Sequence, residues 1–567
     1  MLGCKCFFWS KVNDFMQSGP DYFSLPDPIP HWPQGTGFAT STIGLGELEV
    51  SQVTKFEFIW GCNLSTDGKK GVSFYKPIQI PDGFHCLGHY CQSNENPLHG
   101  FVLVAREVKN QQTNSEYMPP LLNPVDYSLI WVSDKEGDDD DDNFDNCGHF
   151  WLPQPPEGYK ALGFVVTNKS EKPNLEAIKC IRVDLTDACE MYRPIVDTYS
   201  KYSKEPLRVS NVRPCHRGMY RKGVFVGTFY CGNYSSLGDE VNISCLKNLD
   251  GSLHAMPNLD QIHGLVRAYG PTLCFHPDEI YLASSVSWFF RNGALLYSKS
   301  TSSGQAIDPE GTTLPAGGTN DGAYWIDLPT DSELASVIKR GNLESAKLYV
   351  HVKPALGGTF TDIVMWVFAP FNGPGTIKIG AMNIGLSKVG RHVGDWEHFT
   401  LRISNFTGEL WKVYFSQHSG GEWVDASDLE FINGNKPIIY SSRNGHASFA
   451  HPGNHIQGSA RLGIGVRDDT GRSNYCVDSS RKYEIVAAEY LGDGVVNEPC
   501  WLQYMREWGP KVVYDSRTEL DRIIKMLPSM VRYSMQNMLD KLPLELYGEE
   551  GPTGPKEKNN WIGDERW

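Results

Sequence analysis

Residues 389–399 read V-G-R-H-V-G-D-W-E-H-F and run directly into T-L-R-I at 400–403, which is expected to be a strand. Successive side chains of a strand point to opposite faces, so Phe399, Leu401 and Ile403 share one face. Counting back by twos places Glu397 and Asp395 on the same face. Two carboxylates therefore begin the row of side chains that faces the core.

These two carboxylates must be neutralised. At an effective dielectric constant of about 20, two charges roughly 5 Å apart repel by about 3 kcal/mol before desolvation is added. A proton, a basic partner or a cation would remove this cost. His392 precedes Asp395 by three residues across Gly394, and carboxylates combined with imidazole suit calcium, magnesium, manganese or zinc. We expect a divalent cation; the alternative is pairing with Arg391 or Arg402.

The composition describes an acidic globular protein. The chain has 567 residues, of which 40% are apolar, and a formal net charge of −15, which argues against general nucleic-acid binding. Its 14 cysteines form no regular framework, and no apolar run approaches the about 20 residues of a spanning helix, so we expect reduced thiols and a cytoplasmic location. Cys4 and Cys6 are candidates for acylation, which would anchor residues 1–22 to a membrane; free thiols are the alternative.

The stretch 23–250 contains an internal repeat. F-x-x-P followed by G-[FY]-x-x-L-G occurs at 74–88 and again at 150–163, and each copy leads into an apolar strand, at 100–107 and 178–184. A fainter third copy is expected at 224–231 and 243–250. One such unit cannot bury its own apolar face, so three units predict a threefold, β-prism-like domain over 23–250. Such folds usually bind glycans or lipid headgroups.

Three clusters in this half carry charge or potential metal ligands. His85, Cys86, His89 and Cys91 have no zinc-finger spacing, so packing is the preferred interpretation. The acidic run at 136–142 lacks the spaced ligands of a calcium loop and is interpreted as a solvated loop. The basic stretch 201–222 predicts either a surface for anionic lipid or phosphate, or a face that docks on an acidic partner domain. Its cations are Lys201, Lys204, Arg208, Arg213, Arg217, Arg221 and Lys222.

The pattern changes after residue 250. Asn258 and Gln261 have the spacing of a helix capping box, which predicts a helical connector over 251–275. Strands separated by turn signals dominate 276–515, around a short helix at 331–340, and predict an antiparallel β-sandwich. The segment 516–567 is expected to hold helices, the first with a capping box at Ser516 and Glu519, and an extended tail. Those helices either pack against the sandwich or insert a methionine-rich stripe into a membrane. The predicted fold class is mainly β.

Several of these motifs together resemble the plant branch of the vacuolar protein sorting-associated protein 62 family. They are the two F-x-x-P repeats, P-T-L-C-F-H-P-D-E at 271–279, H-V-G-D-W-E-H at 392–398 and G-P-T-G-P-K at 551–556. The resemblance covers nearly the whole chain from about residue 20. It implies a link to the delivery of proteins to the vacuole.

The central segment is also similar, more distantly, to the G-H-R-H-D-W-E signature of necrosis- and ethylene-inducing peptide-like proteins. These are sandwich cytolysins that hold a divalent cation and bind plant sphingolipid headgroups. The resemblance implies that His392, Asp395 and Glu397 are metal ligands. It also matches His418 to a second histidine segment and offers Asn372, a neutral ligand, where the cytolysins have an aspartate. Further polar candidates at the same end of the sandwich are His398, His446 and Glu422.

The sequence therefore predicts a non-enzymatic binding protein. Its expected partner is a membrane lipid headgroup or a glycan, and its expected place is the periphery of a vacuolar, endosomal or plasma membrane. One alternative is a membrane-permeabilising defence protein, which the cytolysin similarity suggests. The other is a metal-dependent hydrolase with His418, His398 or Glu422 as the general base. The sequence has no nucleophile elbow, phosphate loop or dinucleotide fingerprint, so the hydrolase hypothesis rests on the metal alone.

Overall fold

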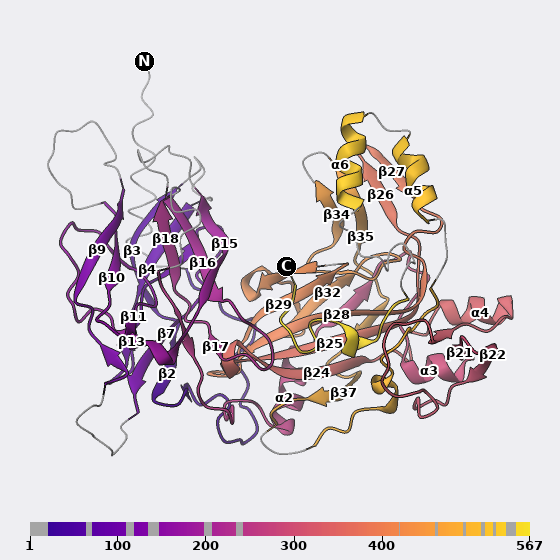
Figure 1. Cartoon of the computed structure of the whole chain (residues 1–567), viewed down its shortest axis with the longest axis horizontal. Helices are drawn as coiled ribbons and strands as arrows, with labels where there is room; N and C mark the ends of the chain where they lie inside the picture. The colour runs from indigo at the N-terminus through magenta and orange to yellow at the C-terminus, as the bar shows by residue number, and fades with distance from the viewer. Residues whose placement is uncertain are drawn as a thin grey trace.

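The computed structural model describes residues 21–63, 71–108, 118–133, 147–197, 207–233, 242–418, 420–459, 463–491, 495–511, 516–525, 529–539 and 551–566. A repeat domain lies at one end of the molecule and a larger sandwich domain at the other, and a small sheet with two helices projects from the sandwich (Figure 1). Strands predominate in both domains and most of their pairs are antiparallel, which confirms the prediction of a mainly β protein.

The N-terminal domain consists of three units with the same topology. Each unit has two sheets. In one sheet the final strand of the unit lies in the middle, between a strand from the start of the unit and a two-residue strand; three other strands form the second sheet. The first unit contains β1 (Thr42–Gly44), β2 (Leu48–Val53), β3 (Phe56–Asn63), β4 (Gly71–Pro77), β5 (His85–Cys86), β6 (Tyr90–Ser93) and β7 (Val102–Glu107). The second contains β8 (Leu121–Leu122), β9 (Asp126–Val132), β10 (His149–Gln154), β11 (Tyr159–Lys160), β12 (Val165–Thr167) and β13 (Cys180–Arg182). The third contains β14 (Thr186–Asp187), β15 (Cys189–Asp197), β16 (Leu207–Pro214), β17 (Gly223–Val224), β18 (Phe229–Asn233) and β19 (Cys245–Lys247).

The repeated L-G motif lies where the three units meet. Leu87 and Leu162 are fully buried in a core shared by the units. The glycines that follow them let the backbones approach closely: a Cβ on Gly163 would lie 2.7 Å from Thr228 Cγ2 and 3.1 Å from Gly88 Cα. A side chain at this position would overlap its neighbours, so the motif marks the contact between units.

The third copy begins earlier in the chain than the sequence predicts. The strand equivalent to β4 and β10, which carry F-x-x-P, is β16, whereas we expected this copy at 224–231 and 243–250. β16 ends at Pro214 but lacks the phenylalanine, and the second half of the motif is reduced to G-V-F-V-G at 223–227. The third unit has the same strand order as the other two but lacks the phenylalanine of the repeated motif.

The segment expected to be a connector contributes to the sandwich core. The Asn258 side chain accepts a hydrogen bond from the Gln261 backbone N–H, and the Gln261 side chain accepts one from the Asn258 N–H, which confirms the capping box. Ile262 and Leu265 of the helix are buried in the same core as Phe275. The elements of this layer are α2 (Leu259–Tyr269), β20 (Thr272–Phe275), β31 (Phe431–Ile432), β32 (Lys436–Ser441), β33 (Ser448–Phe449) and β36 (Cys476–Asp478).

A six-stranded sheet forms the centre of the sandwich and is covered on both faces. Its order is β30-β29-β28-β25-β24-β37, and every residue of β25 is buried, as in strands that pack on both sides. One face packs on the α2 layer; the other packs on α3, the β21–β23 sheet and the tryptophans near the end of the chain. The strands are β24 (Leu348–Ala355), β25 (Phe360–Asn372), β28 (His392–Ser404), β29 (Leu410–Gln417), β30 (Gly420–Asp425) and β37 (Tyr483–Ala488). The covering elements are α3 (Val286–Arg291), β21 (Leu295–Ser298), β22 (Thr301–Ala306), β23 (Tyr324–Asp327) and α4 (Ser332–Lys339).

The C-terminal helices pack on the small sheet that projects from the sandwich (Figure 1). Leu520, Ile524 and Met535 are buried against that sheet, which favours the packing alternative. The Glu519 carboxylate of the predicted capping box accepts from the backbone N–H groups of 387 and 388, and the Ser516 side chain lies outside the described part of the structure. The elements are β26 (Thr376–Ile379), β27 (Met382–Gly385), β34 (Gly453–Ser459), β35 (Ile464–Thr470), α5 (Ser516–Lys525) and α6 (Ser529–Leu539).

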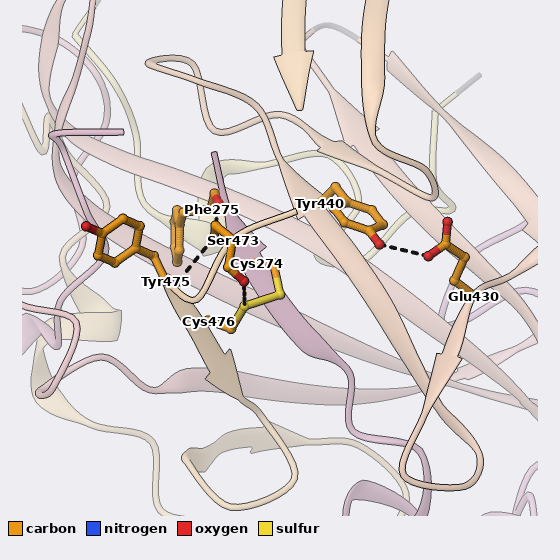
Figure 2. The surroundings of a disulfide bond; sticks show 7 residues. All are labelled: Cys274, Phe275, Glu430, Tyr440, Ser473, Tyr475 and Cys476. Carbon is orange, nitrogen blue, oxygen red and sulfur yellow. Dashed lines mark hydrogen bonds between the residues drawn. A yellow bond between two sulfur atoms is a disulfide. The ribbon is translucent and has the colours of Figure 1, made fainter. Parts of the chain in front are cut away.

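A disulfide joins Cys274 of β20 to Cys476 of β36 (Figure 2). The two residues are direct cross-strand partners with Cα atoms 4.1 Å apart. Beside them, the Ser473 hydroxyl donates to the Phe275 carbonyl and accepts from the Tyr475 N–H. The expectation of reduced thiols does not hold for this pair.

Candidate binding site

The two carboxylates of the central segment lie at the start of β28. Asp395 is buried and Glu397 is partly buried, while Trp396 between them packs on the other face against Trp508, which confirms the predicted alternation. Gly394 has φ +69°, and a Cβ there would lie 2.2 Å from the Trp508 carbonyl oxygen. This contact explains why glycine stands before the aspartate.

His446 neutralises Asp395. Its Nδ1 lies 2.7 Å from Asp395 Oδ2, and its Nε2 lies 2.7 Å from the carbonyl oxygen of Tyr281. Because a carboxylate and a carbonyl only accept hydrogen bonds, both ring nitrogens carry hydrogen and the ring is an imidazolium. Burial lowers the pKa of His446, but the hydrogen bond to Asp395 and the charges of Glu279 and Asp395 outweigh it and raise the pKa to about 9.

The two arginines proposed as partners of Asp395 bond to other groups. Arg391 donates to the carbonyl oxygen of Ser387. Arg402 forms two 2.8 Å hydrogen bonds with Asp362, on the opposite face of the central sheet. His392 Nε2 lies 3.8 Å from Asp395 Oδ1. Although burial raises the pKa of Asp395, the His446 hydrogen bond and the His392 charge hold it below its ordinary value.

Glu397 and His418 form the second part of the site. Glu397 Oε2 accepts a 2.6 Å hydrogen bond from the Ser416 hydroxyl, and burial together with the Asp395 charge raises the pKa of Glu397 to about 7. His418 Nε2 lies 2.9 Å from Asp468 Oδ2. Burial lowers the pKa of His418, but the Asp468 charge and hydrogen bond raise it to about 9.

Asp468 is a site residue that the sequence did not indicate. It is 3% exposed, lies on β35 and also accepts a 3.2 Å hydrogen bond from the Ser442 hydroxyl. It contacts His418, which is 50 residues earlier in the chain. The two adjacent aspartates of R-D-D-T give no local signal of this contact.

Three non-glycine residues around these pairs have left-handed backbone conformations. They are His418, with φ 51°, Asn444, with φ 69°, and His446, with φ 54°. Such conformations are uncommon and costly outside glycine, and they concentrate at functional sites. The surrounding structure therefore holds both histidines in place against a backbone preference.

Except for His446, which holds Asp395 from behind, these residues line a cavity of about 400 Å³. Asn372 lines it, and because its amide nitrogen donates to the carbonyls of 373 and 390, its Oδ1 remains for a ligand. His398 also lines the cavity, with its Nε2 2.9 Å from Glu565. Glu422 lines a different cavity with His451 and is not brought to this site. Lining residues include Trp366, Asn372, His392, Asp395, Glu397, His398, Tyr414, Ser416, His418, Asn444, Asp468 and Lys558.

A divalent cation needs several oxygen or nitrogen ligands around one point. Among the residues that the structure describes, no group of three or more His, Cys, Asp or Glu is arranged as metal ligands. The carboxylates and histidines pair with one another instead, His446 with Asp395 and His418 with Asp468. As placed, the residues do not fit a cation, and the cation predicted from the sequence stays a prediction.

The basic stretch is divided between the domain junction and the surface. Arg217 donates to Glu190 and to Asp564 of the C-terminal segment, at 2.9 and 2.8 Å, and Arg213 donates to Glu190. Arg208 is partly buried; Arg221 and Lys222 are exposed. Docking on the partner domain thus accounts for Arg217, whereas Arg213 pairs with Glu190 within the repeat domain. Lys201, Lys204, Cys4, Cys6 and the acidic run 136–142 lie outside the described residues.

The fold and the cavity define a class of protein in which a threefold β repeat domain is joined to a sandwich that carries a polar site. The chain belongs to the family described as vacuolar protein sorting-associated protein 62, which matches residues 19–565. It is 25% identical over 248 residues to vacuolar protein sorting-associated protein 62 of Saccharomyces cerevisiae, across 37% of this chain and 50% of that protein. The chain thus spans about half the length of this yeast relative.

Solved structures with partial similarity cover little more than a third of the chain. The crystal structure of GNIP1Aa from Chromobacterium piscinae is 15% identical with a TM-score of 0.27, across 38% of this chain and 40% of that one. NLPPya in complex with glucosamine is 14% identical with a TM-score of 0.20, across 35% and 67%. At these values the similarity says nothing about what this chain binds. Within the described chain, no helix has the length and apolar character to cross a membrane.

Proposed function

We propose that this protein acts in vacuolar protein sorting as a non-enzymatic peripheral membrane protein that binds a sugar, presented as a glycan or as a glycolipid headgroup. The observation that carries the proposal is the 400 Å³ cavity lined by Asp395, Glu397 and the His418–Asp468 pair, with aromatic rings beside them. A cavity of this size with a few convergent polar groups and shifted pKa values is the usual form of a binding site.

The chemistry of the cavity suits sugar hydroxyls. Charged Asp395 and Asp468 accept hydrogen bonds, whereas Glu397, with a pKa of about 7, can accept or donate near neutral pH. Tyr414 and Trp366 line the cavity beside His398, whose ring centroid lies 5.7 Å and 4.7 Å from theirs. The Trp366 indole N–H is buried and donates to no atom of the described chain, so a ligand oxygen would supply its missing acceptor.

The test measures binding to a glycan array and to vesicles that carry glycosylated sphingolipids. Asp468→Asn and Glu397→Gln should weaken binding by about tenfold or more, because each removes a group placed to contact hydroxyls. Glu422→Gln is the matched control, since it makes the same change on the neighbouring strand outside the cavity. Circular dichroism and the unfolding temperature check that the variants fold.

Equal binding by all variants would overturn the proposal. Dye release from the same vesicles would instead support the membrane-permeabilising alternative. Turnover of generic phosphate or acyl esters that is lost in Glu397→Gln would support the hydrolase.

The predicted cation needs its own measurement. Elemental analysis after equilibration with calcium, magnesium, manganese and zinc, beside an Asp395→Asn/Glu397→Gln double variant, would detect it. One ion per chain that the variant loses would mean that side chains of the site rearrange on binding, since the present pairs leave no three-ligand set among the described residues. No bound ion would leave the histidine–carboxylate pairs as the means of neutralisation.

A further inference from the structure

A second cavity lies at the junction of the two domains. It has a volume of about 70 Å³ and is lined from one side by the repeat domain and from the other by β28, β29 and β30. The repeat domain contributes Arg213 and Arg217, and the sandwich contributes Arg402, Trp411 and Trp423. The space suits a small polar group, and it is separate from the sugar site proposed above.

The lining of this junction cavity is cationic although the protein is acidic. Five of its lining side chains are Arg or Lys, and among the described lining residues Asp564 is the only acid. Other carboxylates hold these cations without lining the cavity: Asp362 pairs with Arg402, Asp425 with Lys412, and Glu190 is shared by Arg213 and Arg217. Burial and the neighbouring Arg217 charge lower the pKa of Arg213, and Glu190 offsets them in part.

Two indole N–H groups add donors to the same cavity. Trp411 and Trp423 are 4% and 5% exposed, and neither indole nitrogen donates to any atom of the described chain. Both rings are fixed, since His99 stacks on Trp411 at 4.4 Å and the Arg402 guanidinium lies 4.0 Å above the Trp423 ring. A buried donor without an acceptor is costly and rare in folded proteins. Two of them at one cationic cavity indicate that an acceptor belongs there.

We propose that the junction cavity binds the oxyanion of a phosphate group, with the Trp411 and Trp423 indoles and the guanidinium of Arg217 as donors. A phosphate ester presents mainly acceptor oxygens, which suit the guanidinium, ammonium and indole donors of the lining. The remainder of the lining is mostly apolar and includes Phe101, Phe225, Leu356 and Phe360. An open depression that shares Arg217 and Asp564 with this cavity adds His216, Arg221 and Arg566, together with the acid Glu565. The phosphate is either a free phosphate ester or the headgroup of a phosphorylated lipid.

Titration calorimetry of the full chain with inorganic phosphate tests the site. Trp423→Phe and Trp411→Phe keep the rings and remove the donors, and each should weaken phosphate binding by about tenfold. Trp508→Phe is the matched control, because its indole N–H also has no acceptor in the described chain but lies in the core behind the central sheet. Arg217→Gln should abolish binding, whereas Arg106→Gln, at an exposed pair, should not change it.

A second readout does not depend on affinity. With ¹⁵N-labelled tryptophan, phosphate should shift two indole N–H resonances, which disappear in Trp411→Phe and Trp423→Phe. Vesicles with and without a phosphatidylinositol phosphate distinguish the sources: sedimentation that Arg217→Gln abolishes identifies a lipid headgroup, and binding of soluble phosphate alone identifies a free ester. The proposal is overturned if millimolar phosphate leaves both resonances unshifted, or if the tryptophan variants bind as the wild type does.

Discussion

The contact between the repeat units predicts a large effect from adding one methyl group. In Gly163→Ala the new Cβ would lie 2.7 Å from Thr228 Cγ2 and 2.8 Å from Thr228 Cβ, closer than carbon atoms approach in proteins. Overpacking of this kind costs about 1–3 kcal/mol, offset by about 0.4–1 kcal/mol because alanine restricts the unfolded chain. We expect a net loss of about 1–2 kcal/mol, which lowers the unfolding temperature of the repeat domain by about 5 °C.

The assay is differential scanning calorimetry of the wild type and three variants. Gly44→Ala is the control, because a Cβ there meets nothing within 4 Å, and it should be neutral or slightly stabilising. Thr228→Ser removes the methyl group that the new alanine side chain would touch and keeps the hydroxyl that donates to the Leu162 carbonyl at 2.6 Å. Adding it to Gly163→Ala should restore part of the loss. If Gly163→Ala proves as harmless as Gly44→Ala, the assignment of the L-G motif to the contact between units is wrong.

Three further predictions concern charge and covalent links. Burial and the Asp395 charge raise the pKa of Glu397 to about 7, so the folded protein binds this proton more tightly than the unfolded chain, and the stability gained is lost as the pH rises through 7. In urea unfolding of chelator-treated protein, the free energy of unfolding of Glu397→Gln should equal that of the wild type at pH 5. At pH 8.5 it should exceed the wild-type value by about 2 kcal/mol, a figure reduced for the partial exposure of Glu397. An equal difference at both pH values would contradict this. Arg402→Gln leaves buried Asp362 without its partner and should cost about 3–5 kcal/mol, whereas Arg472→Gln, at an exposed pair with Glu430, should cost at most about 1 kcal/mol. The Cys274–Cys476 bond closes a loop of 202 residues, so dithiothreitol should lower the stability by up to about 5 kcal/mol and should not affect a Cys274→Ala/Cys476→Ala variant.

Local patterns predicted the fold where the residues interact with near neighbours. Asn258 and Gln261 form the expected capping box because both partners lie within one helical turn. In the Ser516–Glu519 segment, by contrast, the Glu519 carboxylate accepts from backbone donors at 387 and 388, more than 130 residues away, which no local rule could indicate. The alternation of Asp395 and Glu397 was also predictable, since it follows from strand geometry alone.

The candidate site was predicted only in part for the same physical reason. The sequence placed Asp395, Glu397 and His418 near one another, and the structure brings them to one cavity. The identity of the neutralising group depended on His446 and Asp468, which reach the site through separate strands and turns. The tail was expected to be merely extended, yet Glu565 is 3% exposed and holds His398 and Thr400 at the central sheet.

The C-terminal segment connects the two cavities. Asp564 lines the junction cavity and bonds to Arg217 and Arg402, while its neighbour Glu565 bonds to His398 at the edge of the polar cavity. A phosphate at the junction would compete with the Asp564 carboxylate for the same guanidinium groups. Removing the hydrogen bond between Glu565 and His398 should loosen the neighbouring Asp564 and therefore favour phosphate binding.

We expect Glu565→Gln to tighten phosphate binding by about fivefold, the low end of coupling between sites. Glu333→Gln, a change of the same charge on the exposed surface of α4, serves as the control in the same calorimetric titration. Equal phosphate affinity in the wild type and Glu565→Gln would mean that Asp564 and the ligand do not compete. If Glu565→Gln tightens phosphate binding as expected, a sugar that displaces Glu565 from His398 should also raise the phosphate affinity. Because coupling between sites is reciprocal, phosphate should raise the sugar affinity by the same factor. The last residues of the chain would in this way make the occupancy of one cavity depend on the other.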